Sequence, residues 1–386
     1  MHKMYHASVL LCAVVLSGCD TVKQTISDKP TLSDAQITKL IPKRVNNAKL
    51  WAADISDIFD ELSLPKTAQN ICTAIAVIDQ ESNFHADPSV PNLGKAALKA
   101  IDDKLEDKLG KNMASVFRNM LETRPTPKNN FIKQIKAVKT EKQLDELYRE
   151  IFDYFTKTYK IAPLTNITKL SGQGIDERIN PVTTLGSMQV HIDYARAHRR
   201  ASMSDRDLRA DLYTRYGGLY YGIHRLMVYQ AHYDQPLYRF ADYNSGMYSS
   251  RNAAFQQRIA TLSGESLAID GDLLLYKDGS PISKTSATET AAIALLATAS
   301  KPINAQQIRS DFKKEKTRDF EKTITYRAVN DMFANKFGRE PTYAIMPKVV
   351  ISGPKLSRDF DTNWFATRVN ERYQTCITTA KRHQLS

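Results

Sequence analysis

A glutamate at the end of an apolar helix is the residue in this chain best suited to acid–base chemistry. The helix opens at Pro65, and its apolar face repeats through Ile71, Ile75 and Ile78 at helical spacing. Glu81 follows at the edge of that face. A general acid that works near neutral pH needs a carboxylic acid that stays protonated there. Burial in an apolar wall raises the pKa of a glutamate, and the negative end of a helix dipole disfavours its anion. Glu81 is therefore the candidate general acid.

Two short motifs follow Glu81-Ser82-Asn83-Phe84 along the chain. The first is Gly186-Ser187-Met188-Gln189-Val190, and the second is Ala241-Asp242-Tyr243-Asn244-Ser245-Gly246. In this order the three motifs resemble the lytic transglycosylase domain of the lysozyme-like superfamily, where Glu-Ser is followed by Gly-Leu-Met-Gln and then by Ala-Tyr-Asn-x-Gly. The resemblance covers residues 65–94 and 183–255.

The resemblance implies an enzyme that cleaves the bond between N-acetylmuramic acid (MurNAc) and N-acetylglucosamine (GlcNAc) in peptidoglycan. Glu81 would act first as acid and then as base, and the C6 hydroxyl of the same MurNAc would close a 1,6-anhydro ring. Because that hydroxyl is intramolecular, no second carboxylate is needed to position water. If the enzyme were instead a muramidase of the lysozyme kind, Asp87 and Asp242 would be the second-carboxylate candidates, although each also suits a turn or the surface.

The resemblance also assigns substrate-binding roles. Gly186 would let the backbone approach the sugar, while Met188 and Gln189 would line the cleft. Tyr243 and Asn244 would contact the N-acetyl group, unless Tyr-Asn-x-Gly is a simple turn. Ser82 would bond near the glutamate or cap the turn. We expect no cofactor, and no metal, since the histidines and cysteines lack metal-binding spacing.

The chain departs from the family pattern at several positions. Glu81 and Gly186 lie much farther apart than in the family, so residues 95–182 are expected to form a helical insertion. Ser187 replaces leucine, and Asp242 and Ser245 replace small apolar residues. These departures keep open a second hypothesis, a non-catalytic peptidoglycan-binding or scaffolding lipoprotein. In either case the insertion offers a surface for envelope protein partners.

The N-terminus predicts export and a lipid anchor. Residues 1–18 contain Lys3 and an apolar run from Val9 to Leu16, as in a signal peptide. Leu16-Ser17-Gly18-Cys19 resembles a bacterial lipobox, which would make Cys19 the lipidated residue; the alternative is an ordinary signal with a chance cysteine. We expect the periplasmic side of the bacterial envelope, in the inner or the outer membrane. Removal of residues 1–18 would take only Lys3 from the formal charge of +12, so the mature chain would face an anionic wall and lipid with a charge of +11; nucleic acid is not an expected partner.

The remaining cysteines suggest a covalent link. Cys12 would leave with the signal peptide and Cys19 would carry lipid, so Cys72 and Cys376 are left in an oxidising compartment. A disulfide between them would tie the C-terminal tail to the helix that carries Glu81. Two unpaired buried thiols are the alternative.

Composition and periodicity predict a mainly α fold. Apolar residues make up 42% of the chain and charged residues 25%, which excludes collagen, disordered chains and multi-span membrane proteins. We expect a lysozyme-like helical domain, split by the long helical insertion and followed by a helical extension with a small β patch at 267–276. The expected order is a signal peptide (1–18), a lipidated tether (19–38), the lysozyme-like transglycosylase domain (39–255, insertion 95–182) and a C-terminal mainly helical extension (256–386).

Overall fold

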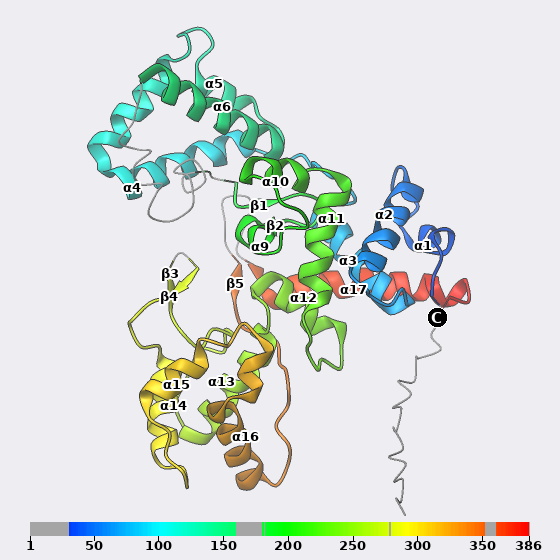
Figure 1. Ribbon diagram of the computed structural model, residues 1–386, viewed down its shortest axis with the longest axis vertical. Helices are drawn as coiled ribbons and strands as arrows, with labels where there is room; N and C mark the ends of the chain where they lie inside the picture. Colours follow the sequence, from blue (N-terminus) through cyan, green and yellow to red (C-terminus); the bar gives the residue numbers. More distant parts are fainter. Residues whose placement is uncertain (1–30, 160–179, 181, 278, 352–359, 386) are drawn as a thin grey trace, which may run out of the picture.

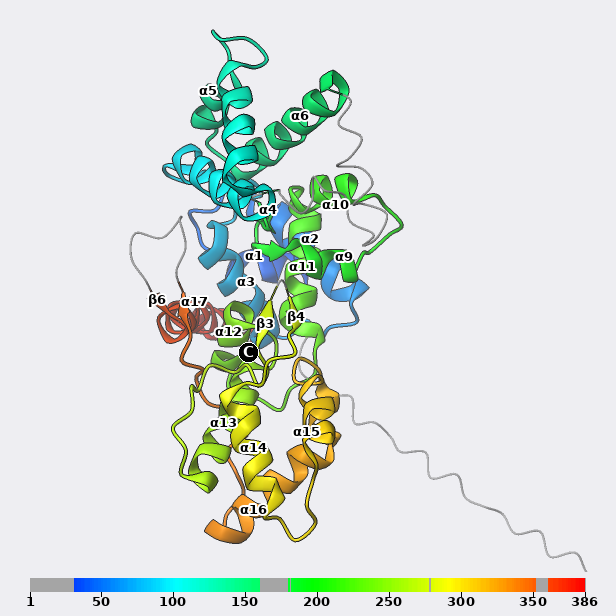
Figure 2. The same ribbon diagram turned by 90° about the vertical axis from the view of Figure 1, so that its left-hand side faces the viewer.

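The computed structural model describes residues 31–159, 180, 182–277, 279–351 and 360–385. The expected signal peptide and Cys19 lie outside these residues. The described chain is mainly helical, which confirms that expectation, and its helices form three groups along the long axis (Figures 1 and 2). Among the helices described, none is long and apolar enough to cross a membrane.

The middle group, here called the central unit, contains the buried helix α3 (Ala68–Ser82). Residues 71–79 of this helix are all buried, so its neighbours surround it. A two-stranded antiparallel hairpin, β1 (Thr184–Leu185) with β2 (Val190–His191), lies beside it. The other elements are α1 (Asp34–Leu40), α2 (Ala48–Glu61), α9 (Ile192–Ala197), α10 (Asp205–Leu212), α11 (Arg215–Ile223), the π-helical turn η2 (His224–Val228), α12 (Pro236–Ser245) and α17 (Thr362–Arg382).

Two boundaries of the central unit differ from the sequence-based expectation. Residues 31–38, expected to be tether, include the start of α1, and Leu32 and Ile37 are buried in the core. At the other end, α17 does not belong with the C-terminal extension. It returns to pack along α3 and α12, and a disulfide joins Cys72 of α3 to Cys376 of α17, with their Cα atoms 5.5 Å apart.

The insertion forms the second group, at one end of the molecule (Figure 1). It contains α4 (Leu93–Thr123), α5 (Phe131–Ala137) and α6 (Glu141–Tyr159), which pack on one another. The segment with Pro125 and Pro127 separates α4 from α5, and α4 itself is interrupted at Gly110, whose φ is +74°. Phe131 and Phe155 lie 5.8 Å apart between the helices, and the core of the central unit continues into this group.

The third group, here called the second unit, has a hydrophobic core of its own around Phe255, Phe312 and Phe320. It begins at Ser249, before the expected boundary at residue 256. The β patch is shifted, since its hairpin begins only at Tyr276 and pairs antiparallel. The elements are α13 (Ser249–Ser263), β3 (Tyr276–Lys277), β4 (Ser280–Pro281), α14 (Ala287–Ala297), α15 (Ala305–Phe312), the 3-10 turn η3 (Arg318–Lys322) and α16 (Ile324–Phe337). A pair formed by β5 (Val350–Ile351) and β6 (Phe360–Asp361) precedes α17.

Candidate functional site

Glu81 lies half-buried in the last turn of α3. The helix begins behind Thr67, whose side chain accepts from the backbone NH of Asn70, and ends at Asn83 in the left-handed conformation. Ser82 is buried, and its hydroxyl donates to the carbonyl of Ile78 at 3.1 Å. The Ser82 hydroxyl therefore donates its hydrogen bond within its own helix and does not cap the turn that follows.

The Gly186 motif forms the tight turn between β1 and β2. Gly186 has a φ of +76°, and a Cβ added there would lie 2.2 Å from the carbonyl oxygen of Leu212. The close approach that requires glycine is therefore to the protein's own backbone. Met188 is fully buried, and a Cβ on Gly222 of α11 would lie 2.3 Å from its sulfur. Met188, expected to line the cleft, therefore lies in the core, where its side chain fills the space beside Gly222.

The insertion contacts the Gly186 motif through Gln189. The Gln189 amide nitrogen donates to the Glu141 carboxylate at 2.9 Å and to the Gly186 carbonyl at 3.2 Å, while its oxygen accepts from the Thr184 hydroxyl at 3.1 Å. Glu141, the first residue of α6, is only 2% exposed. A buried carboxylate of the insertion thus fixes the side chain of a candidate substrate-binding residue.

A buried ion pair makes a second link between insertion and central unit. Asp145 of α6 and Arg209 of α10 are both fully buried, and their side chains lie 2.8 Å apart. Asn180 also donates to the Asp145 carboxylate, at 2.7 Å. Asp145 also pairs with Arg149 of its own helix at 2.9 Å, and the bonds to Arg209 and Asn180 link the insertion to the central unit.

The third motif is helical, not a turn, because Tyr243 and Asn244 lie inside α12. The Tyr243 hydroxyl donates to the backbone carbonyl of Met188 at 2.7 Å, and the guanidinium of Arg225 lies 4.9 Å from the centre of its ring. Asn244 has a buried side-chain oxygen without a hydrogen-bond partner in the described part of the chain. The buried hydroxyl of Ser187, in the second motif, also has no hydrogen-bond partner among the described residues.

The electrostatics around Tyr243 bring Glu81 into the same site. Burial raises the pKa of the Tyr243 phenol, the positive charge of Arg225 lowers it, and the negative charge of Glu81 raises it. Tyr194 lies nearby, with its hydroxyl 2.7 Å from Nδ1 of His224. The structure thus gathers residues of all three motifs around one phenol. It adds Arg225, Tyr194 and Glu141, which the sequence motifs do not include.

Asp242 is buried in α12 rather than exposed at the surface; burial raises its pKa, and its side chain caps the N-terminus of α13. Its fully buried carboxylate accepts from the backbone NH groups of Tyr248 and Ser250, at 2.9 and 2.8 Å, and from the Ser249 hydroxyl at 3.0 Å. The hydroxyls of Tyr229 and Tyr233 also donate to it. A carboxylate at a helix N-terminus is favoured by the helix dipole, so Asp242 fixes the start of α13 against α12.

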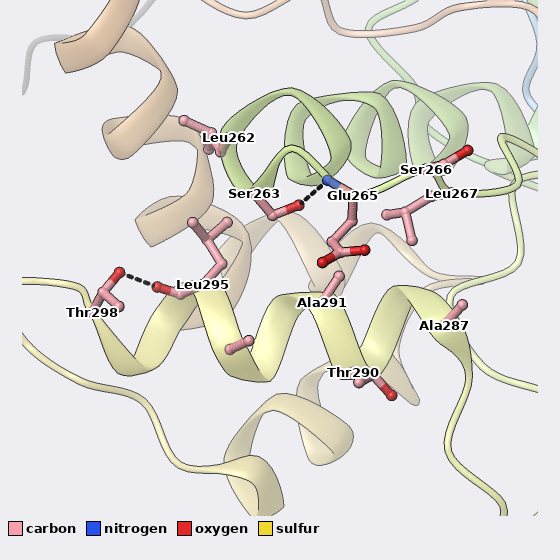
Figure 3. Close-up of a pocket in the computed structure, with 11 residues that line it drawn as sticks. Leu262, Ser263, Glu265, Ser266, Leu267, Ala287, Thr290, Ala291, Leu295 and Thr298 are labelled. Atoms are coloured by element: carbon pink, nitrogen blue, oxygen red, sulfur yellow. Dashed lines mark hydrogen bonds between the residues drawn. The ribbon is translucent and has the colours of Figure 1, made fainter.

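Asp87 lies at a cavity of about 260 Å³ next to the end of α3. Arg44, Trp51 and Phe84 also line this cavity, and the two rings meet edge to face 5.3 Å apart. A larger cavity, of about 540 Å³, lies between α13 and α14 in the second unit (Figure 3). It contains none of the motif residues. In the described ranges, no cluster of His, Cys, Asp and Glu could hold a metal ion.

Comparisons with known proteins identify a relative and a family that each match most of the chain. The chain is 33% identical over 373 residues to the "Uncharacterized protein YaiW" of Escherichia coli (strain K12), an alignment that covers 95% of this chain and 96% of that protein. No solved structure matches the chain. Residues 44–379 match a family model described as "Protein of unknown function (DUF1615)", and the chain therefore belongs to that family.

Proposed function

We propose that this protein is a membrane-anchored lytic transglycosylase with a lysozyme-like central unit, and that Glu81 is its general acid and base. The observation that carries the proposal is the meeting of the three motifs at Tyr243. Its hydroxyl binds the Met188 carbonyl, and the charge of Glu81 acts on its phenol. This arrangement supports the proposal, because the resemblance to lytic transglycosylases requires the three motifs to meet.

In the proposed reaction the Glu81 carboxylic acid donates its proton to the oxygen of the MurNAc–GlcNAc bond as the bond to C1 breaks. The C6 hydroxyl of the same MurNAc then attacks C1 and returns its proton to Glu81, so no water is consumed. The intramolecular attack gains from a high effective concentration.

The proposed setting is the periplasmic side of the cell envelope, with Cys19 as lipid anchor and peptidoglycan as substrate. The sequence pattern of residues 1–19 supports this setting. The insertion would then face away from the central unit toward envelope partners, since Figure 1 places α4 and α5 at the far end of the molecule.

A second candidate function is non-catalytic peptidoglycan binding or scaffolding. The observation that favours it is that Gln189 bonds to Glu141, Thr184 and Gly186, so its amide is already occupied by the protein. Together with the burial of Met188, this leaves fewer motif side chains for a sugar.

Digestion of purified peptidoglycan sacculi separates these hypotheses. A lytic transglycosylase releases 1,6-anhydro-muropeptides, whereas a muramidase releases only products with reducing ends. A scaffolding protein stays bound to sacculi in a pull-down and releases no soluble products. Mass spectrometry of the soluble fraction distinguishes the three outcomes, because the anhydro product is lighter than the hydrolysis product by one water.

A further inference from the structure

Helix α3 has a second polar face, which points away from Glu81. Asp79 precedes Glu81 by two residues, which puts their side chains about 160° apart around the helix. Asp79 is 5% exposed, and it forms ion pairs with Arg44, in the segment after α1, and with Arg372 of α17. The Nε of Arg372 lies 3.3 Å from its carboxylate. One buried carboxylate thus gathers two guanidinium groups from different parts of the chain.

A cavity of about 590 Å³ opens at this point between α1, α3 and α17. Its lining carries five cationic side chains against two carboxylates, and Cys376 of the disulfide is part of its wall. Within the described ranges, Lys39, Lys43 and Arg382 form no ion pair, so their charges are not neutralised by the protein. The cationic residues of this cavity are Lys39, Lys43, Arg44, Arg372 and Arg382.

We propose that this cavity binds the phosphate group of an anionic lipid headgroup. A phosphate offers several acceptor oxygens and a full negative charge, which suits converging arginine and lysine side chains. Asp79 and the disulfide hold α3 and α17 in place, so the arginines are positioned before the ligand arrives. The cavity is separate from the Glu81 site, and the proposal does not depend on the transglycosylase activity.

The short distance along the chain from Cys19 to the cavity indicates a lipid as the source of the phosphate group. α1 borders the cavity and begins at Asp34, 15 residues after Cys19. Fifteen extended residues reach at most about 50 Å, so an anchor at Cys19 would keep this end of the central unit near the headgroups. Near an anionic membrane, each cation at the surface adds to the attraction, and the effect decays within the Debye length.

The test uses the chain with Cys19→Ser, which cannot be acylated at that residue, in co-sedimentation with vesicles. Vesicles of phosphatidylcholine with phosphatidylglycerol should bind the protein, and vesicles of phosphatidylcholine alone should not. Arg382→Gln or Lys43→Gln should weaken binding about tenfold. Lys381→Gln is the matched control, because it removes the same charge from the adjacent, exposed position outside the cavity, and it should leave binding within about twofold.

Inorganic phosphate distinguishes the two sources of the group. It should compete with the vesicles more strongly than sodium chloride of equal ionic strength. If Arg382→Gln and Lys381→Gln weaken binding equally, diffuse charge explains it and the proposal is wrong. A third outcome is that inorganic phosphate binds to the protein in a titration, that Arg382→Gln abolishes this binding, and that vesicles do not bind. In that case the ligand is free phosphate, and the lipid assignment is wrong.

Discussion

The hydroxyl of Tyr243 in α12 donates a hydrogen bond to the backbone carbonyl of Met188, 55 residues earlier in the chain, at 2.7 Å. Both residues are buried, so neither group has water as a substitute partner. This bond fixes the turn between β1 and β2 against α12, and the charge of Glu81 reaches the same phenol. The geometry of the candidate site therefore depends on one side chain.

Replacing Tyr243 with phenylalanine should cost stability, because it leaves the buried Met188 carbonyl without its partner. We expect the free energy of unfolding to fall by about 1 to 3 kcal/mol in urea denaturation. Tyr213→Phe is the matched control, since the Tyr213 hydroxyl is also buried but has no hydrogen-bond partner in the described part of the chain. That variant should be neutral or more stable. Equal losses in both variants would show that the bond to Met188 contributes nothing.

Gly186→Ala should disrupt the turn that carries Met188 and Gln189. The added Cβ would meet the Leu212 carbonyl at 2.2 Å in a left-handed backbone conformation, so we expect a loss of about 2 to 4 kcal/mol. Gly264→Ala isolates the backbone term, because Gly264 has a similar φ of +78° and nothing within 4 Å of the added Cβ. It should cost only about 1 kcal/mol. Chemical denaturation of the two variants side by side measures the difference, and similar values would rule out the steric account.

The bond between Glu141 and Gln189 should couple the insertion to the site. In a double-mutant cycle of Glu141→Ala and Gln189→Ala, the coupling free energy should be about 1 to 3 kcal/mol, since the bond is charge-assisted and buried. The exposed pair Lys99–Asp103 in α4 is the control, and its coupling should be close to zero. Additive effects at Glu141 and Gln189 would mean that the insertion does not hold the motif.

The second unit should be less stable at neutral than at acidic pH because of Glu315. Burial raises the pKa of this carboxyl to about 7, from 4.5. Between those values the unfolded chain releases a proton that the folded chain keeps, so stability falls as the pH rises from about 4.5 to 7, by up to about 3 kcal/mol.

Thermal unfolding of wild type and Glu315→Gln across this range measures the effect. Glutamine cannot ionise, so the stability of the variant relative to wild type should increase toward pH 7. The variant loses one acceptor for the Leu273 NH or the Tyr276 hydroxyl, but that loss is the same at every pH. A constant difference between the two proteins would contradict a raised pKa at Glu315.

The sequence predicts where helices form better than it predicts which other elements they pack against. The spacing of Ile71, Ile75 and Ile78 predicts the buried helix before Glu81, and the Ser204 cap predicts the start of α10. In α17, by contrast, the apolar residues give a buried face without saying what covers it. The one signal for its return to α3 is Cys376.

The side-chain details of the site are harder to predict for the same reason. The burial of Met188 depends on Gly222, 34 residues later, because a glycine there leaves the space that the Met188 side chain occupies. Glu141 lies in a segment with many charged residues, so the sequence alone does not distinguish its buried carboxylate from the exposed ones around it. Its role becomes visible only when α6 is placed against the turn between β1 and β2.

The most direct test of the central claim is mass spectrometry of sacculi digested by wild type and by Glu81→Gln. The claim predicts 1,6-anhydro-muropeptides from wild type and none from Glu81→Gln, with the variant still folded by circular dichroism and still bound to sacculi. Asp87→Asn, which removes a carboxylate that follows the end of α3, should keep the wild-type products. Anhydro products from Glu81→Gln, or no products from wild-type protein that binds sacculi, would contradict the assignment of Glu81 as the catalytic acid and base.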